Sequence, residues 1–383
     1  MMTRIDTQRR LLLQGLGLAT LLPTRLALAA GKNTVPEAPR LVVVMLRGAL
    51  DGLAAVPAPG DPAWAALRGA DGPAPLPLDG FFGLHPALTG LQRWWGEGQL
   101  LLLHAAASPY RERSHFDAQQ LLESGGERPF ELGTGWLGRA LQASGQGSAV
   151  ALSSSLPLAL RGAQQAGTWT PARRAGADED LLARVGQLYQ DDAALSAAWQ
   201  RAMAQQGMLG GESAGTGNGF AALARQAGTF LAAEQGPRVA WLEANGWDTH
   251  TNQAGRLQRL LAGLDEGLLA LREALGAQWP HSTVLVMTEF GRSAVLNGSG
   301  GTDHGTAGMA LLAGGAVAGG KVLTDWPGLA RTQLLDGRDL RPTLDLRQLI
   351  AALLQRQFGL SQAQLAGGVL PGVSARELAL WRA

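Results

Sequence analysis

Acidic and histidine side chains occupy five short segments of the sequence, although the chain contains only six histidines. Carboxylate oxygens and imidazole nitrogens, without thiolates, are ligands that suit zinc, manganese, magnesium or calcium. The chain has no cysteine, which excludes thiolate metal sites, disulfides and a cysteine nucleophile. The sequence therefore predicts a site for one or two divalent ions. The candidate ligands are Asp51, Asp248, His250, Glu289, Asp303 and His304.

The spacing within these segments indicates how the side chains would act. Asp248 and His250 are two residues apart, so in extended backbone both point to one side, as two ligands of one ion should; the alternative is a solvated loop. Asp51 in LRGALDG is either a ligand or an ordinary turn acid, because Asp-Gly suits tight turns. Glu289 follows an apolar run and is costly to bury unpaired. We therefore expect a cation or an arginine beside it, Arg292 being the simplest candidate.

Asp303 and His304 stand side by side in a glycine-rich loop, NGSGGTDHGTAG. Glycines let a backbone pass close to a ligand and permit positive φ angles. If the loop binds an ion, His304 supplies a ring nitrogen, and Asp303 either binds too or orients the imidazole. The alternative is a flexible surface turn with both side chains in solvent.

The segment SPYRERSHFDAQ carries the candidate catalytic residues Arg113, Ser114 and His115. Ser114 is either a nucleophile at a helix start or an N-cap with Asp117 at the third helical position. A metal ion would lower the pKa of Ser114 or of a bound water. Arg113 or Arg47 would clamp an anionic ester.

The elements that must position these side chains are continuous apolar runs, which are typical of strands buried on both faces of a parallel sheet. A leucine-rich helical pattern spans residues 255–276, and another amphipathic helix is expected at 344–359. We therefore expect an α/β fold, a three-layer αβα sandwich with a mostly parallel doubly wound sheet. Its polar clusters should meet beyond the carboxyl ends of the strands. The predicted strands are 41–46, 100–105, 148–153, 237–244, 282–290 and 308–315.

One domain should cover residues 38–383, with a helical insertion at about 156–225 where Ala, Gln and Gly are frequent. Residues 1–30 have the basic start, apolar middle and small residues of an export signal. Arg9-Arg10 before the apolar run predicts the twin-arginine type, with the twin-arginine translocase as partner during export. An ordinary secretory signal and an uncleaved anchor are the alternatives. We expect a periplasmic or secreted protein with no stable transmembrane segment in the mature chain.

The charge of the chain excludes a strong electrostatic role. Its formal net charge is +1 and only 16% of its residues are charged. Such a chain creates no strong field for nucleic acid or anionic lipid. We therefore expect no nucleic-acid partner.

Seven motifs, in this order, resemble the exported bacterial proteins known as domain of unknown function 1501, over nearly all of the mature chain. They are LVVVMLRGALDGL, SHFDAQQLLESG, GWLGRAL, NGWDTHTNQ, VLVMTEFGR, GSGGTDHG and DWPGL. Members of that family commonly carry twin-arginine signals. They look like the alkaline phosphatase and sulfatase superfamily in fold, and no general reaction is assigned to them.

The resemblance implies a site residue by residue. Asp51 matches the superfamily's first acid, Ser114 its helix-start nucleophile, and His304 its last histidine. Asp248 with His250 matches the acid and histidine of the first metal. Glu289 takes the place of the Asp-His pair after the next strand.

Two departures limit what the resemblance implies. Phe290 stands where the superfamily usually has a histidine ligand, and the Asp248 to His250 spacing is shorter than usual, so a complete two-metal site is in doubt. The ASPYR segment has Ala107 at the position of the residue that sulfatases convert to formylglycine. A formylglycine sulfatase is therefore not expected, which leaves Ser114 or Ser108 as nucleophile.

Three functions compete on these grounds. The first is a metal-dependent hydrolase or transferase of phosphate or sulfate esters. The second is a non-catalytic protein that binds an envelope polymer on a degenerate phosphatase-like scaffold. The third is a metal-free serine hydrolase, which lacks the G-x-S-x-G elbow. Tightly bound metal would separate the first from the other two.

Overall fold

The computed structural model describes residues 38–69, 73–171, 185–192, 196, 199, 219–374 and 376–382. The predicted export signal lies outside these residues, as does much of the predicted insertion at 156–225. Within the described part of that region, residues Leu158–Leu160 form the 3-10 turn η1 and residues Ala166–Thr168 form the edge strand β6. The described part of this region thus adds a short strand to the sheet, and its residues 185–188 and 220–225 are helical. Among the described helices, none combines the length and apolar character needed to cross a bilayer.

A central sheet of nine strands runs through the molecule in the order β10-β4-β9-β8-β1-β7-β5-β6, with β11 also pairing with β4. Every pairing is parallel except the two made by β9, which lies antiparallel between β4 and β8. The prediction of a mostly parallel sheet is therefore confirmed. The strands are β1 (Arg40–Arg47), β4 (Leu100–Ala107), β5 (Ala149–Ala151), β6 (Ala166–Thr168), β7 (Val239–Asn245), β8 (Ser282–Thr288), β9 (Gly308–Ala313), β10 (Lys321–Leu323) and β11 (Leu344–Asp345). A separate two-stranded sheet joins β2 (Leu76–Pro77) to β3 (Gly83–Leu84).

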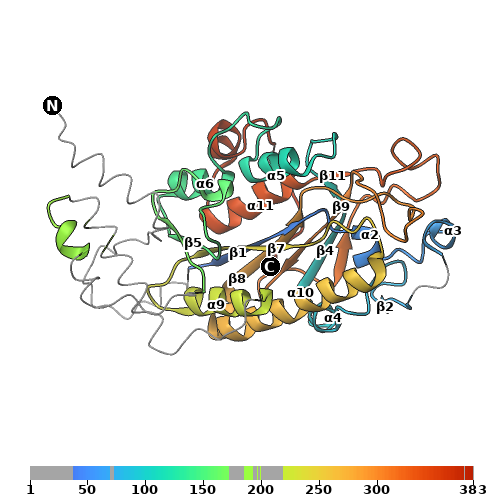
Figure 1. The fold of residues 1–383 in the computed structure, drawn as a ribbon, viewed down its shortest axis with the longest axis horizontal. Helices are drawn as coiled ribbons and strands as arrows, with labels where there is room; N and C mark the ends of the chain where they lie inside the picture. The colour runs from blue at the N-terminus through green and yellow to red at the C-terminus, as the bar shows by residue number, and fades with distance from the viewer. Residues whose placement is uncertain are drawn as a thin grey trace.

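Helices cover both faces of the sheet, which completes the three layers (Figure 1). One face carries α5 (His115–Ser124), α6 (Trp136–Ser144) and α11 (Leu346–Phe358), and the other carries α4 (Thr89–Gly96), α9 (Phe220–Ala232) and α10 (Gln253–Leu275). Further short helices are α2 (Gly52–Ala55), α3 (Trp64–Arg68), α12 (Gln362–Gln364), the 3-10 turn η2 (Gly276–His281) and the π turn η3 (Leu365–Val369).

Strand β1 shows why the layers form. Its side chains alternate between the two faces of the sheet, as strand geometry requires. Leu41, Val43 and Met45 join the core under α6 and α11, whereas Val42 and Val44 join the core under α9 and α10. The length of such a strand is mostly apolar, so polar groups gather mainly where the strands end; the buried His104 in β4 is an exception.

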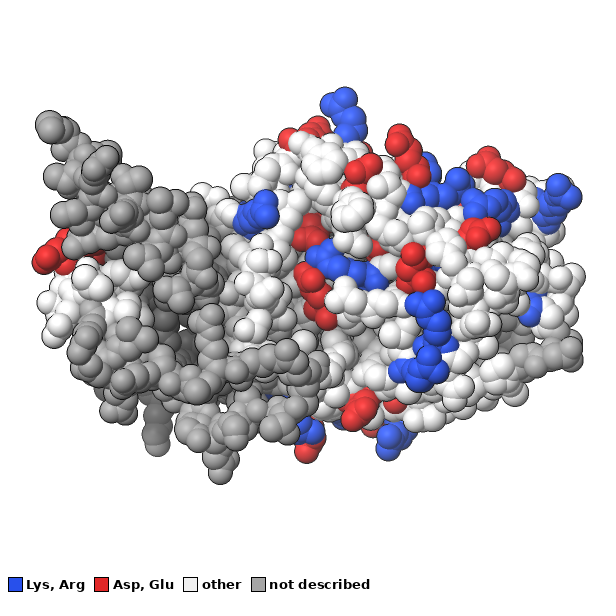
Figure 2. Space-filling model, in the orientation of Figure 1, with Lys and Arg blue, Asp and Glu red and all other residues white. Residues whose placement is uncertain are grey.

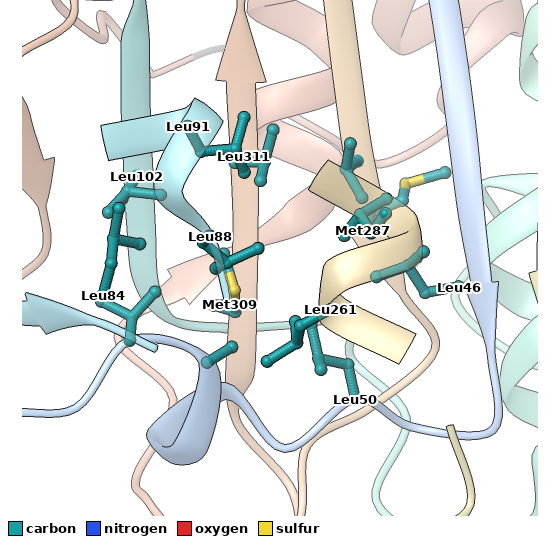
Figure 3. A pocket seen from close by; sticks show the side chains of 14 residues that line it. Leu46, Leu50, Leu84, Leu88, Leu91, Leu102, Leu261, Met287, Met309 and Leu311 are labelled. Carbon is teal, nitrogen blue, oxygen red and sulfur yellow. The ribbon is translucent and has the colours of Figure 1, made fainter. Parts of the chain in front are cut away.

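A small space remains inside the second of these cores, between the sheet and helices α4 and α10 (Figure 3). Leucine, methionine, valine and alanine side chains line it, including Leu46, Leu261 and Met309. Because no polar side chain faces it, this space is core packing and not a ligand site.

Candidate metal centre

Four side chains that could bind an ion meet at the edge of the sheet where β1, β7 and β8 end. His115 is the first residue of α5, and Asp248 and His250 lie in the loop after β7. His304 comes from the glycine-rich loop before β9. Because β9 is antiparallel to its neighbours, its amino end lies at the carboxyl ends of β4 and β8. This is the only way a loop that precedes a strand reaches the same edge.

The ligand atoms of these side chains are close together. His304 Nε2 lies 3.0 Å from His115 Nε2, 3.0 Å from His250 Nε2 and 3.3 Å from Asp248 Oδ1. Asp248 Oδ1 is also 3.0 Å from His250 Nε2. The ligand atoms of His115, Asp248 and His304 all lie within 4.8 Å of one another. We call these four residues, including His250, the histidine cluster.

The other ring nitrogen of each histidine faces an oxygen. His304 Nδ1 lies 3.0 Å from the carbonyl oxygen of Arg113, and His115 Nδ1 lies 2.8 Å from Glu289 Oε1. His250 Nδ1 lies 3.6 Å from Asp303 Oδ1. A carbonyl or carboxylate oxygen only accepts hydrogen bonds, so Nδ1 of His115 and of His304 carries the proton. The Nε2 lone pairs of a neutral His115 and a neutral His304 then point into the cluster.

This arrangement fits a divalent ion. Two Nε2 lone pairs facing each other at 3.0 Å repel unless a proton or a cation lies between them. Histidine ligands typically donate Nδ1–H to a carboxylate or carbonyl behind them, which fixes the tautomer and the ring orientation. Burial and the nearby His115 lower the pKa of His304, whereas the Glu289 hydrogen bond raises the pKa of His115 against the effect of burial. The donor set of imidazole and carboxylate suits zinc or manganese.

Asp248 is held in the cluster by a buried arginine. Arg292 is 1% exposed and donates from Nη1 to Asp248 Oδ1 at 2.6 Å. Its Nε donates to Thr302 Oγ1 at 3.1 Å, and Thr302 in turn bonds the amide oxygen of Gln253 at 2.7 Å. Burial alone would raise the pKa of Asp248. The hydrogen bond and the charge of Arg292 lower this pKa, and the net shift is downward. Asp248 therefore stays ionised and directed at the histidines.

Asp51 does not reach the histidine cluster. Its side chain accepts from Ala54 N at the start of α2, and Arg68 binds it through Nη1 at 2.6 Å and Nη2 at 3.1 Å. Gln253 Nε2 completes its partners at 2.7 Å. Burial would raise the pKa of Asp51, yet the charge of Arg68 holds it below the ordinary value. A guanidinium group thus supplies the cation that the sequence led us to expect from a metal.

Glu289 is buried behind His115 and orients that imidazole instead of entering the cluster. Its Oε1 also accepts from Gln119 Nε2 at 2.9 Å and from Gly48 N at 2.8 Å. Burial raises the pKa of Glu289, but these hydrogen bonds, led by that of His115, leave it below its usual value. The partner expected from the sequence, Arg292, instead binds Asp248.

The candidate catalytic residues other than His115 have structural partners. Ser114 is the N-cap of α5 and accepts from Asp117 N, which is the alternative the sequence left open. Among the described contacts, none joins its hydroxyl to an imidazole. Arg113 binds the buried Asp339, and Arg47 binds Glu243.

Two further residues shape the cluster. Phe290, where the resemblance led us to look for a histidine ligand, is buried with its ring centroid 4.9 Å from that of His115 and 5.2 Å from that of His304. It forms an apolar wall that confines both imidazoles. Asn297 Nδ2 donates to Asp303 Oδ1 at 3.1 Å and to the His250 carbonyl at 2.9 Å. The sequence offered no signal for Asn297, because its role depends on a loop folding back on another loop.

The sequence matches the family described as protein of unknown function DUF1501 over residues 103–370. The chain belongs to this family. No curated protein sequence matches this DUF1501 protein.

Solved structures similar to this DUF1501 protein include sulfatase- and phosphatase-like enzymes. Ps i-CgsB in complex with k-i-k-neocarrahexaose is 9% identical with a TM-score of 0.46, covering 86% of this chain and 74% of that one. A 2-O GAG sulfatase is 11% identical with a TM-score of 0.40, covering 85% and 71%. The alkaline phosphatase of the Antarctic bacterium TAB5 is 12% identical with a TM-score of 0.35, covering 73% and 91%.

Proposed function

We propose that this protein is an exported, metal-dependent hydrolase of phosphate or sulfate esters, with the histidine cluster holding one divalent ion. The observation that carries the proposal is the pairing of each histidine Nδ1 with an oxygen while the three Nε2 atoms and Asp248 converge. One ion is proposed instead of two because Arg68 already neutralises Asp51 and Phe290 replaces a ligand.

When bound, such an ion would supply Lewis acidity to the ester and lower the pKa of a water. The chain's own residues would bind and orient the substrate. Arg113 and Arg338 both contact the buried carboxylate of Asp339, and Arg338 Nη2 also donates to the His304 carbonyl at 2.7 Å. Two guanidinium groups that share one carboxylate leave a positive charge beside His304. Both arginine side chains are partly exposed, so an anionic ester can reach them.

Water is the nucleophile in this proposal, because the hydroxyl of Ser114 is engaged at the start of α5. It accepts from Asp117 N, and it also hydrogen-bonds the phenol of Tyr110. A Ser114→Ala variant should lose about 1 kcal/mol of stability through the missing cap and keep hydrolytic activity.

A second candidate is a non-catalytic protein that binds an envelope polymer. The observations that favour it are the capped Ser114 and the apolar Phe290 at a ligand position. In either case we propose that the chain leaves the cytoplasm through the twin-arginine translocase, on the basis of Arg9-Arg10 in the sequence.

Elemental analysis of protein purified without chelators tests the proposal. We expect about one divalent ion per chain, hydrolysis of p-nitrophenyl phosphate or sulfate, and a lower melting temperature after chelation because bound metal stabilises the native state. The variant His304→Ala should lose both metal and hydrolysis, whereas the matched control His85→Ala removes an imidazole outside the cluster and should keep both. Metal without hydrolysis would favour the second candidate. Metal-free wild type with an unchanged melting curve would exclude the metal centre.

A further inference from the structure

An open groove of about 550 Å³ lies beside the histidine cluster, over the first half of α5 and the loop that follows β5. Phe116 and Phe130 line it, together with serine hydroxyls of the segment 153–155 and the paired side chains of Arg47 and Glu243. The metal-site proposal uses none of these side chains.

The groove and the cluster are neighbours along α5. Phe116 directly follows His115 in the first turn of α5. Gln119, one turn further, lines the groove and donates to Glu289, the residue that orients His115. Its amide oxygen accepts from Arg47 Nη1 at 2.6 Å. A ligand long enough to pass from the cluster along the first turn of α5 would reach this groove.

Two phenylalanine rings at the groove are the most exposed large apolar side chains of the described residues. Phe116 is 85% exposed and Phe130 is 71% exposed. Leaving two aromatic rings in water forgoes the stabilisation that burial would give. Aromatic surface gathered at one groove is typical of a binding site.

The backbone holds Phe130 in a conformation that a bulky residue rarely adopts, with φ of +61°. Gln120 maintains it: its Oε1 accepts from Phe130 N at 2.6 Å, and its Nε2 donates to Leu132 O at 3.2 Å. Strained backbone that keeps a side chain exposed points to a use for that side chain.

The charges around the groove balance. Arg47 and Arg161 supply two positive charges, and Glu123 and Glu243 supply two negative ones. Arg47 is already bound to both carboxylates, at 2.7 Å and 2.6 Å. On the face drawn in Figure 2, basic and acidic side chains are likewise interspersed, without a large area of one sign. The part of a ligand that occupies the groove should therefore be uncharged.

We propose that the groove binds a neutral carbohydrate, the sugar portion of an ester whose charged group reacts at the histidine cluster. The C–H faces of a sugar ring are apolar and weakly positive, so they pack on the negative faces of Phe116 and Phe130. Hydroxyl groups of the sugar can hydrogen-bond to the serine hydroxyls of residues 153–155 and to the paired side chains of Arg47 and Glu243. The place of the groove in a reaction rests on the proposed function, but the binding itself does not.

A peptide fits the groove less well. An extended peptide binds by adding to an exposed sheet edge, whereas this groove lies over strand ends and loops. A helical peptide needs a continuous apolar floor, and here the apolar residues Leu132, Leu156 and Pro157 are interrupted by serine, glutamine and ion-paired side chains.

The test is binding of the full mature chain to an array of unsubstituted hexose, pentose and N-acetylhexosamine oligosaccharides, followed by calorimetry with the best ligand. The double variant Phe116→Ala/Phe130→Ala should bind that ligand about tenfold or more weakly. Phe116→Leu/Phe130→Leu should lose binding too, because leucine keeps apolar area but has no aromatic face. Leu188→Ala, which shortens another exposed apolar side chain outside the groove, should bind as wild type does.

The outcomes separate this inference from the metal proposal. His304→Ala should retain oligosaccharide binding, since its lost imidazole lies in the cluster and not in the groove. The carbohydrate inference is overturned if no oligosaccharide of the array binds in a way that depends on the two phenylalanines. It is also overturned if the leucine variant binds as well as wild type. Both outcomes count even if metal and hydrolysis are present. Phenylalanine-dependent binding by metal-free protein would support it while contradicting the proposed hydrolase.

Discussion

Glu289 and Asp303 occupy equivalent positions behind two histidines of the cluster, but they differ in burial. Glu289 is fully buried and lies 2.8 Å from His115 Nδ1, whereas the side chain of Asp303 is 54% exposed and lies 3.6 Å from His250 Nδ1. A buried carboxylate acts on its partner with little screening, while an exposed one is screened by solvent. The two acids should therefore contribute unequally to metal affinity.

Glu289→Gln should weaken metal binding about 10- to 100-fold, which is the usual effect of losing such a supporting carboxylate. The amide preserves the shape of the side chain but removes the charge that increases the basicity of His115. Asp303→Asn should weaken binding less. Metal affinity measured by competition with a chromophoric chelator checks both variants. Wild-type affinity in Glu289→Gln would show that the charge of Glu289 does not contribute to metal binding through His115.

His104, in β4, gives the protein a pH-dependent stability that is independent of the cluster. Burial lowers its pKa to about 4, against a hydrogen bond with the Val56 carbonyl that raises it. The unfolded chain binds a proton near pH 6.5 and the folded chain does not, so the free energy of unfolding falls as pH drops below 6.5. From pH 7 to pH 5 this contribution is about 2 kcal/mol.

Urea unfolding at several pH values measures this effect. His104→Gln removes the titrating group, so its free energy of unfolding should fall less between pH 7 and pH 5 than that of wild type. The absolute stability of the variant does not matter, because the slope with pH is the readout. Identical slopes would mean that His104 has the same pKa in the folded and unfolded chains.

At the scale of elements, the glycine-rich loop reaches the cluster because its backbone packs directly on another loop. A Cβ added at Gly301 would lie 2.2 Å from the backbone carbon and oxygen of His250, and one at Gly305 would lie 2.3 Å from the carbonyl carbon of Arg292. Gly298, in contrast, has open space around it and an ordinary φ. Only some glycines of the loop are therefore required for its position.

Gly301→Ala should displace His250 from His304, lowering both the metal content and the stability, the latter by about 1–3 kcal/mol as expected for overpacking. Gly298→Ala is the matched control and should behave as wild type. Elemental analysis and thermal unfolding of the two variants decide the matter. Equal metal content in both would show that the contact with His250 does not position the ligand.

At the scale of the whole molecule, the antiparallel strand β9 determines the site. It lies between β4 and β8 and brings His304 to the edge where the parallel strands deliver His115, Asp248 and His250. A site assembled in this way from distant segments forms only when the whole sheet has folded, and the twin-arginine route that we propose carries already folded cargo.

Residues 1–35 fused to a reporter that is active only outside the cytoplasm should direct its export through the twin-arginine translocase. Replacing Arg9 and Arg10 by lysine should abolish this export, because the receptor recognises the arginine pair. Reporter activity in cell fractions gives the measurement. Unchanged export of the lysine variant would assign residues 1–30 to another route.

The sequence alone determined the layers of the fold and the edge at which polar groups gather. Continuous apolar runs such as 41–46 and 282–290 are typical of strands buried on both faces, and the helical pattern at 255–276 has one apolar face. These two patterns predicted a mostly parallel sheet between helices. The same logic predicted that Asp248, His250 and His304 share one edge.

Only the tertiary structure decided which cation each acid receives. Asp51 and Asp248 look alike in sequence, but Arg68, 17 residues from the first, binds it completely, while Arg292, 44 residues from the second, binds only one side and leaves it facing three imidazoles. Partner choice of this kind depends on the distances between side chains after folding. The sequence shows which strand or helix precedes each acid. It does not show which arginine the folded chain brings within hydrogen-bond distance of that acid.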